Sequence, residues 1–131
     1  MMQSLRFLLT SLAILLTTAV PSLAAETFPY DQARFAAAQS EGRPILVDIS
    51  ASWCPTCAAQ KPIIERVTAR PEFDKLIIFK VDFDTQKDAV RGFAARMQST
   101  LIGFKGTKET DRSVGDTKER SIEHLLASTL G

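Results

Sequence analysis

The chain contains only two cysteines, Cys54 and Cys57, and they are three residues apart. A nearly continuous apolar run over residues 45–51 precedes them, and a helical pattern begins directly after Cys54. On the first turn of a helix, two sulfur atoms at this spacing can form a disulfide or open to a dithiol. The unpaired N–H groups and the positive dipole end of that helix favour a thiolate on Cys54. A thiolate is the nucleophile of thiol–disulfide exchange, so exchange is the chemistry that this motif predicts.

The first 25 residues have the pattern of a secretory signal peptide. Arg6 supplies a positive charge, residues 7–20 are mostly apolar, and small residues precede a predicted cleavage near Ala24 or Ala25. The apolar stretch is shorter than the roughly 20 residues that a spanning helix prefers, so an uncleaved membrane anchor is the less favoured alternative. We therefore expect a periplasmic or otherwise exported protein with a single domain over residues 26–131.

Export affects how the two cysteines are interpreted, because an even number of cysteines in an exported chain usually forms structural disulfides. A bridge between Cys54 and Cys57 closes a very small loop. In the chain-entropy model it constrains the unfolded chain less than a loop of roughly 15 residues, which contributes about 3 kcal/mol. A redox-active pair is therefore favoured over a structural disulfide.

Composition indicates an ordinary globular domain. Hydrophobic residues make up 45% of the 131 positions, enough for a buried core. The 16 basic and 15 acidic residues give a net charge of +1, and removing the first 25 residues removes only Arg6, which leaves 15 of each. A neutral domain without a basic cluster gives no electrostatic support for binding nucleic acid or an anionic membrane.

The residues around the cysteines resemble the active site of the thioredoxin family. Trp53 directly precedes the pair, Asp48 lies six residues before Cys54, and Pro62 lies eight residues after it, where thioredoxins carry a helix-kinking proline. The segments 79–84 and 100–106 resemble later strands of the family. The resemblance covers roughly residues 30–130. It implies an α/β, thioredoxin-like fold of three layers, in which a mixed central sheet has helices on both faces.

The same resemblance implies roles for three residues. Cys54 would attack a substrate disulfide, and the more buried Cys57 would then attack Cys54 and release the reduced substrate. Asp48 would accept the proton of Cys57, since an acid in an apolar strand is costly to ionise and can exchange a proton near the working pH. The alternative for Asp48 is an acid at a strand end that faces water. Lys80 is expected near this acid.

Substrate contacts are expected from Trp53, Pro55, Thr56, Gln98 and Ser99. Ser99 stands where thioredoxins carry a cis-proline that faces the cysteines. A cis peptide before a non-proline residue costs about 2.5–4 kcal/mol, so we expect a trans Gln98–Ser99 bond. The serine could change how substrate pairs with Gln98, donate to a thiolate, or leave room for a metal ion. A tolerated variation without functional effect is the alternative.

The residues between the cysteines bear on the direction of electron flow. Strongly oxidising members of the family carry a histidine there that stabilises the thiolate, whereas this chain has Pro55 and Thr56, and its single histidine is His124. The pair is therefore expected to be more reducing than oxidising. Outside the cytosol it would need electrons, and a membrane thiol reductant of the DsbD or CcdA kind is the expected source. We expect protein thiol and disulfide substrates, no cofactor and a monomer.

A non-enzymatic role is the alternative function. Cys54 and Cys57 could hold a soft metal, either copper(I) or an iron–sulfur centre shared between two chains. Two thiolates are too few for a closed zinc site in one chain, and no further cysteine or histidine cluster completes one, so we predict no metal site within the chain itself. The missing proline at Ser99 is the only feature that supports metal binding.

Apolar spacing and turn residues predict eight elements in the order α-β-α-β-α-β-β-α. Strands separated by helices imply parallel pairing, and a closing hairpin adds antiparallel strands. Pro62 is expected to kink or break its helix, and Asp116 to cap the last one. The predicted helices cover residues 31–41, 55–69, 86–97 and 117–129, and the predicted strands cover residues 45–51, 76–83, 100–105 and 110–114.

Overall fold

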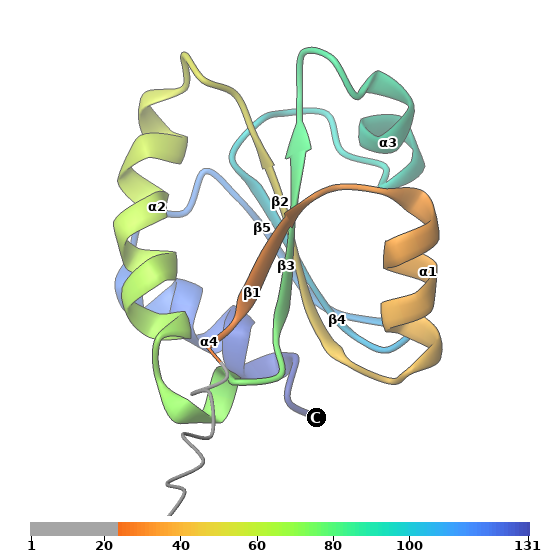
Figure 1. Ribbon diagram of the computed structural model, residues 1–131. Coiled ribbons are helices and arrows are strands. Elements are labelled where there is room, and N and C mark those ends of the chain that lie inside the picture. The colour runs from red at the N-terminus through yellow and green to blue at the C-terminus, as the bar shows by residue number, and fades with distance from the viewer. Residues whose placement is uncertain (1–23) are drawn as a thin grey trace, which may run out of the picture.

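The computed structural model describes residues 24–131, which form a five-stranded sheet with the strand order β1-β3-β2-β4-β5 (Figure 1). The predicted signal segment lies outside the described residues except for its last two positions. The strands are β1 (Glu26–Pro29), β2 (Pro44–Ser50), β3 (Ile77–Asp82), β4 (Thr100–Lys105) and β5 (Lys108–Val114). The helices are α1 (Gln32–Ser40), α2 (Pro55–Thr68), α3 (Lys87–Gly92) and α4 (Glu119–Ser128), with a 3-10 turn at Pro71–Phe73.

The sheet is mixed, as predicted. β3 runs parallel to both β1 and β2, whereas β4 is antiparallel to β2 and β5 is antiparallel to β4. The helices between β2, β3 and β4 provide the connections, and a tight turn at Gly106 closes the β4–β5 hairpin. Since β2 pairs with both β3 and β4, it is the central strand, and the cysteine motif follows directly from its end.

Helices cover both faces of the sheet, which gives the three expected layers (Figure 1). Along β2, Ile45, Val47 and Ile49 belong to the apolar core formed with α1 and α3. Leu46 belongs to the second core, formed with α2 and α4. Because side chains alternate between the faces of a strand, Asp48 lies on the same face as Leu46, under α2.

Three local predictions were wrong. The short β1, which pairs with the edge of β3, was not predicted. The helix expected over residues 86–97 is limited to Lys87–Gly92, because Ala94 takes a left-handed conformation with φ of 53° and the helix cannot continue. The cap of α4 is Lys118, and the Asp116 carboxylate accepts a hydrogen bond from Lys118 N at 3.0 Å before the helix begins.

Pro62 does not interrupt its helix. It lies inside α2, which continues from Pro55 to Thr68. A proline has no N–H, so the carbonyl of Ala58 lacks the hydrogen bond that another residue at position 62 would donate. Ala58 is itself an exposed residue. Within residues 24–131, none of the helices is long and apolar enough to cross a membrane.

Candidate active site

Cys54 and Cys57 form a disulfide at the start of α2, with 5.3 Å between their Cα atoms. Cys54 is the N-cap residue, in an extended conformation, and its Sγ accepts a hydrogen bond from Cys57 N at 3.1 Å. Pro55 occupies the first turn, where its missing N–H costs nothing. The sulfur of Cys54 therefore lies at the positive end of the helix dipole, an arrangement that favours a thiolate after reduction.

The relative burial of the two cysteines differs from the prediction. Cys54 is buried, with 3% of its surface exposed, whereas Cys57 is only half-buried. Cys54 is held against the end of β2, because its N–H donates to the carbonyl of the buried Ala51 at 3.2 Å and its sulfur folds back over the first turn of α2. The prediction that Cys57 is the more buried of the two residues was therefore wrong for this disulfide form.

Asp48 is buried, and Lys80 is its ionic partner. The residue is 5% exposed, so the alternative of an acid that faces water is wrong. Lys80 Nζ lies 2.6 Å from Asp48 Oδ2, as expected, and the lysine side chain is 39% exposed. A cavity of about 160 Å³ lies against both groups and extends along α2 past Glu65 and Thr68. Such a space is large enough to hold water beside the Asp48–Lys80 pair.

Trp53 is exposed but anchored. The residue is 58% exposed, and its Nε1 donates to Asp84 Oδ2 at 2.7 Å. Asp84 is held in turn by Asp82, whose Oδ1 accepts from Asp84 N at 2.9 Å and from Thr85 N at 3.0 Å. The backbone hydrogen bonds from Thr85 and Asp84 hold the pKa of Asp82 below its ordinary value. A chain of hydrogen bonds thus connects the β3–α3 turn to the residue beside Cys54.

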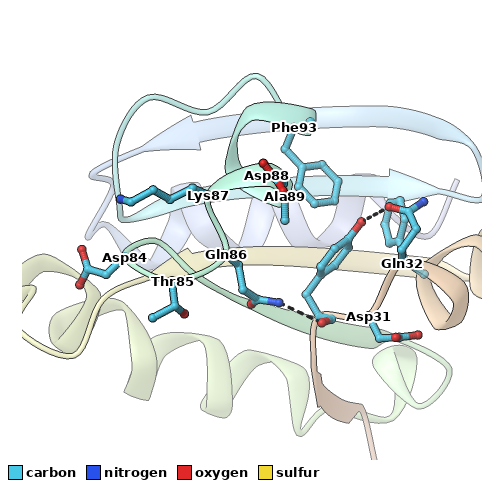
Figure 2. A pocket seen from close by; sticks show the side chains of 12 residues that line it. Asp31, Gln32, Asp84, Thr85, Gln86, Lys87, Asp88, Ala89 and Phe93 are labelled. Atoms are coloured by element: carbon cyan, nitrogen blue, oxygen red, sulfur yellow. Dashed lines mark hydrogen bonds between the residues drawn. The ribbon is translucent and has the colours of Figure 1, made fainter.

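A pocket of about 750 Å³ adjoins this turn on the side of α1 and α3. Figure 2 shows Asp84 and Thr85 at one end of the pocket and Gln32 and Asp31 toward the other. Tyr30 also lines the pocket, and its pKa is raised by burial and then by the nearby Asp31 carboxylate. The pocket lining contains no cysteine, and the Trp53–Asp84 hydrogen bond connects its rim to the disulfide loop.

The Gln98–Ser99 peptide is trans, as expected, since no peptide bond among the described residues is cis. Ser99 is buried, with 4% of its surface exposed, and takes a left-handed φ of 59°. Its hydroxyl donates to the Gln98 carbonyl at 2.5 Å, so its single hydrogen is directed to the backbone and not to a sulfur. The Ser99 carbonyl accepts from Gly115 N at 2.9 Å and from Gln60 Nε2 at 3.3 Å.

The strand register brings the predicted site residues to one edge of the sheet. Ile49 near the end of β2 pairs with Thr100 at the start of β4, and Thr100 pairs with Val114 at the end of β5. The residues expected to contact substrate lie on the segments that follow β2 or precede β4 at this edge. They are Trp53, Pro55 and Thr56 after β2, and Gln98 and Ser99 before β4.

Two residues at this site were not predicted from the sequence. Asp84 anchors Trp53. The sequence indication was that Asp84 follows shortly after Asp82, at the end of the strand, where a tight turn is expected. Gln60 is 1% exposed and contacts the Ser99 carbonyl. The sequence carried one indication of this: Gln60 is a polar residue three positions after Cys57 and four before Ile64, a spacing that puts it on the side of α2 that is buried. Among residues 24–131, no three histidine, cysteine, aspartate or glutamate side chains form a group that could hold a metal ion.

Comparison with known proteins places the geometry in a family. The family model described as thioredoxin matches residues 26–128. This chain belongs to the thioredoxin family. It is 30% identical to the thioredoxin of Alicyclobacillus acidocaldarius over 104 residues, which cover 79% of this chain and 98% of that one. It is 34% identical to the thioredoxin of Mycobacterium tuberculosis over 91 residues, covering 70% and 78% of the two chains.

Solved structures agree with this family assignment. The crystal structure of Trxlp from Edwardsiella tarda is 40% identical, with a TM-score of 0.75, and the match covers 77% of this chain and 98% of that one. The thioredoxin-like α/β fold and the paired cysteines identify this member of the thioredoxin family as a thiol–disulfide oxidoreductase.

Proposed function

We propose that this thioredoxin-family protein is exported and works as a reductant, with Cys54 as the nucleophile toward disulfides in protein substrates. The observation that carries the proposal is the position of Cys54 as the N-cap of α2, where its sulfur accepts the Cys57 N–H. Helix N-terminal donors stabilise a thiolate, and the thiolate is the form that attacks a disulfide. Cys57 then attacks the mixed disulfide, which releases the substrate dithiol and restores the Cys54–Cys57 disulfide.

The reducing direction is supported by what lies between the cysteines. Pro55 and Thr56 provide no positive charge, and His124 lies far along the chain in α4. A cationic neighbour would stabilise the thiolate further. It would therefore stabilise the reduced form relative to the disulfide, which is the property of an oxidant. Without that charge, the N-terminal donors of α2 are the principal thiolate-stabilising feature, so the dithiol gives up its electrons more readily.

The surface around the disulfide suits a polypeptide substrate. The large hydrophobic side chains that are exposed in the described part of the chain are Trp53, Met97 and Val114, at 58%, 52% and 55%. Trp53 follows β2, Met97 precedes β4 and Val114 ends β5, and the register of these strands places all three at the same edge. Exposed apolar side chains of this kind are typical of sites that contact other proteins. We infer that unfolded or partly folded proteins are the substrates.

The N-terminal pattern supports export. A positive residue, an apolar stretch and small residues before Ala24 match a signal peptide. A reductant outside the cytosol is used up by each turnover, so it needs a supply of electrons. A membrane thiol reductant of the DsbD or CcdA kind would reduce the Cys54–Cys57 disulfide by the reverse of the exchange reaction. Fusion of residues 1–30 to a reporter enzyme that is active only outside the cytosol tests export directly.

The decisive measurement is the reduction potential of the Cys54–Cys57 pair, obtained by equilibrating residues 25–131 with redox buffers and trapping the free thiols. A value near that of thioredoxin, about −270 mV, is expected. A value near that of DsbA, about −120 mV, would mean that the pair introduces disulfides, and the reducing direction would be wrong.

Metal binding through the same cysteines is the alternative function, and Ser99 in the position of the family proline is its only support. Two chains would have to contribute both of their cysteines to complete the ligand set of an iron–sulfur centre. Anaerobic purification followed by metal analysis and an absorbance spectrum separates the two functions. We expect no stoichiometric metal, and a bound copper or iron–sulfur centre would contradict a purely enzymatic role.

A further inference from the structure

Gln60 is a buried polar residue one turn after Cys57. Only 1% of its surface is exposed, and it shares the covered side of α2 with Ile64 and Val67, both of which are apolar and buried. An amide that is removed from water in this way is costly unless its polar atoms find partners. Its partners therefore indicate what the residue does.

The nitrogen of the Gln60 amide is fully used. Nε2 donates to the carbonyl of Asp116 at 2.9 Å and to the carbonyl of Ser99 at 3.3 Å. Ser99 precedes β4, and Asp116 lies between β5 and α4. The Ser99 carbonyl also accepts from Gly115 N at 2.9 Å. Gln60 therefore joins the helix that carries the cysteines to both of these neighbouring segments.

The orientation of this amide follows from its partners. Carbonyl oxygens can only accept hydrogen bonds, so the side of the amide that faces Ser99 and Asp116 must be the nitrogen. The oxygen, Oε1, consequently points the other way. It is buried and has no hydrogen-bond partner in the disulfide form. A buried acceptor without a donor is uncommon in folded proteins and calls for an explanation.

Reduction creates a new donor one helical turn before Gln60. A partner dithiol gives two electrons and two protons to the Cys54–Cys57 disulfide. The S–S bond breaks, two thiols form, and the partner becomes a disulfide. Residues three apart are neighbours on a helix surface, and helical side chains lean toward the N-terminus, so Gln60 leans back over the turn that carries Cys57. Cys57 acquires an S–H group only in this reduced state.

We propose that Gln60 is a positioning residue of the redox site, in which Oε1 accepts a hydrogen bond from the reduced Cys57 thiol while Nε2 holds the Ser99 segment. The hydrogen bond exists only in the dithiol form, so it stabilises that form relative to the disulfide. It also keeps the proton on Cys57, which leaves Cys54, at the helix N-cap, as the thiolate. The proposal depends on the exchange chemistry of the pair and not on the compartment or on the direction of electron flow.

The first test compares the wild type with Gln60→Met, which keeps the length of the side chain and removes its polar atoms. The equilibrium constant for reduction by a glutathione redox buffer should fall about fivefold, the size expected for one neutral hydrogen bond. The Cys57 thiol should also lose its proton at a lower pH, followed by the Cβ carbon signal of labelled cysteine. Thr129→Val is the matched control: it removes a buried hydroxyl that donates to Leu126 O at the end of α4, and it should change neither value.

The second test observes the Gln60 side chain itself and does not depend on how Gln60→Met folds. On reduction of the wild type, the Gln60 side-chain carbonyl carbon should move downfield as it accepts the new hydrogen bond. In reduced Cys57→Ala, which has no S–H at this position, the signal should stay where it is in the disulfide form. A wild-type signal that is unchanged on reduction would overturn the proposal. A Gln60→Met equilibrium constant within about twofold of the wild type would overturn it as well.

Discussion

Lys80 Nζ lies 2.6 Å from Asp48 Oδ2, and the two residues are directly paired in the register of β3 and β2. The aspartate is buried under α2, whereas the lysine side chain is 39% exposed. The pair thus links a buried acid to the surface, next to a cavity of about 160 Å³. Because the lysine reaches solvent, removal of the carboxylate does not leave an isolated buried charge. The pair can therefore be tested by substitution without loss of the fold.

Asp48→Asn should slow the step in which Cys57 resolves the mixed disulfide. An amide cannot take up the proton of the Cys57 thiol, and loss of a general base costs on the order of 100-fold in rate. Stopped-flow release of a chromophoric thiol from the Cys54 mixed disulfide measures this step. Asp88→Asn, at a side chain that is 97% exposed, is the control and should match the wild type. Equal rates for Asp48→Asn and the wild type would remove Asp48 from the mechanism.

The roles of the two cysteines can be tested more sharply because Cys54 is the more buried residue in the disulfide form. If helix N-cap geometry decides nucleophilicity, Cys57→Ser should accumulate a mixed disulfide with substrate through Cys54, whereas Cys54→Ser should accumulate none. Non-reducing gels followed by mass spectrometry of the trapped peptide measure this. If exposure decides instead, Cys54→Ser would trap substrate through the half-buried Cys57, and the assignment of roles would reverse.

The turn that anchors Trp53 should respond to acid through Asp82. Its pKa is lowered in the folded state by hydrogen bonds from Thr85 N and Asp84 N. Its negative charge therefore stabilises the folded state at pH values above the ordinary aspartate pKa of 3.8. That contribution disappears as the pH falls through the lowered folded-state pKa. Asp82→Asn keeps an acceptor oxygen but loses the charge. Denaturant titrations should show this variant to be less stable than wild type at neutral pH, with the difference vanishing in strong acid.

A control for this measurement is available on an exposed acid that makes no such turn. Asp88→Asn removes only an exposed ion pair with Arg91, which contributes little, so this variant should be about as stable as the wild type at neutral pH. The fluorescence of Trp53, the single tryptophan, reports on the same turn through its hydrogen bond to Asp84. A difference between Asp82→Asn and wild type that persists below the folded-state pKa would contradict the electrostatic explanation.

The sequence was sufficient where local signals agreed with the fold. The apolar run of β2, the proline in the first turn of α2 and the spacing of Cys54 and Cys57 predicted the centre of the structure. The burial of Asp48 and its contact with Lys80 followed from the family resemblance. These features depend on neighbours in sequence or on a register that the resemblance already supplies.

The features that were missed depend on contacts between distant segments. β1 has four residues and ends at a proline, so only its pairing with β3 identifies it as a strand. Phe93 and Met97 continue a helical spacing, but the left-handed Ala94 ends α3 before them. The relative exposure of Cys54 and Cys57 and the partners of Gln60 are set by loops that approach from elsewhere in the chain. Helical periodicity cannot report on such contacts.

Ser99 is held in a backbone conformation that proline cannot adopt, which gives a clear order of stabilities. Its φ is 59°, whereas a proline ring fixes φ near −65°. Ser99→Pro should therefore lose about 3 kcal/mol of unfolding free energy, and Ser99→Gly should be at least as stable as the wild type, because glycine takes positive φ freely. Urea titrations give the values. Lys105→Gly, at an exposed position of β4, is the control and should lose about 0.5–1 kcal/mol. A Ser99→Pro variant as stable as the wild type would mean that the segment before β4 re-forms easily around a proline, and that the left-handed serine is not needed to hold it against Gln60.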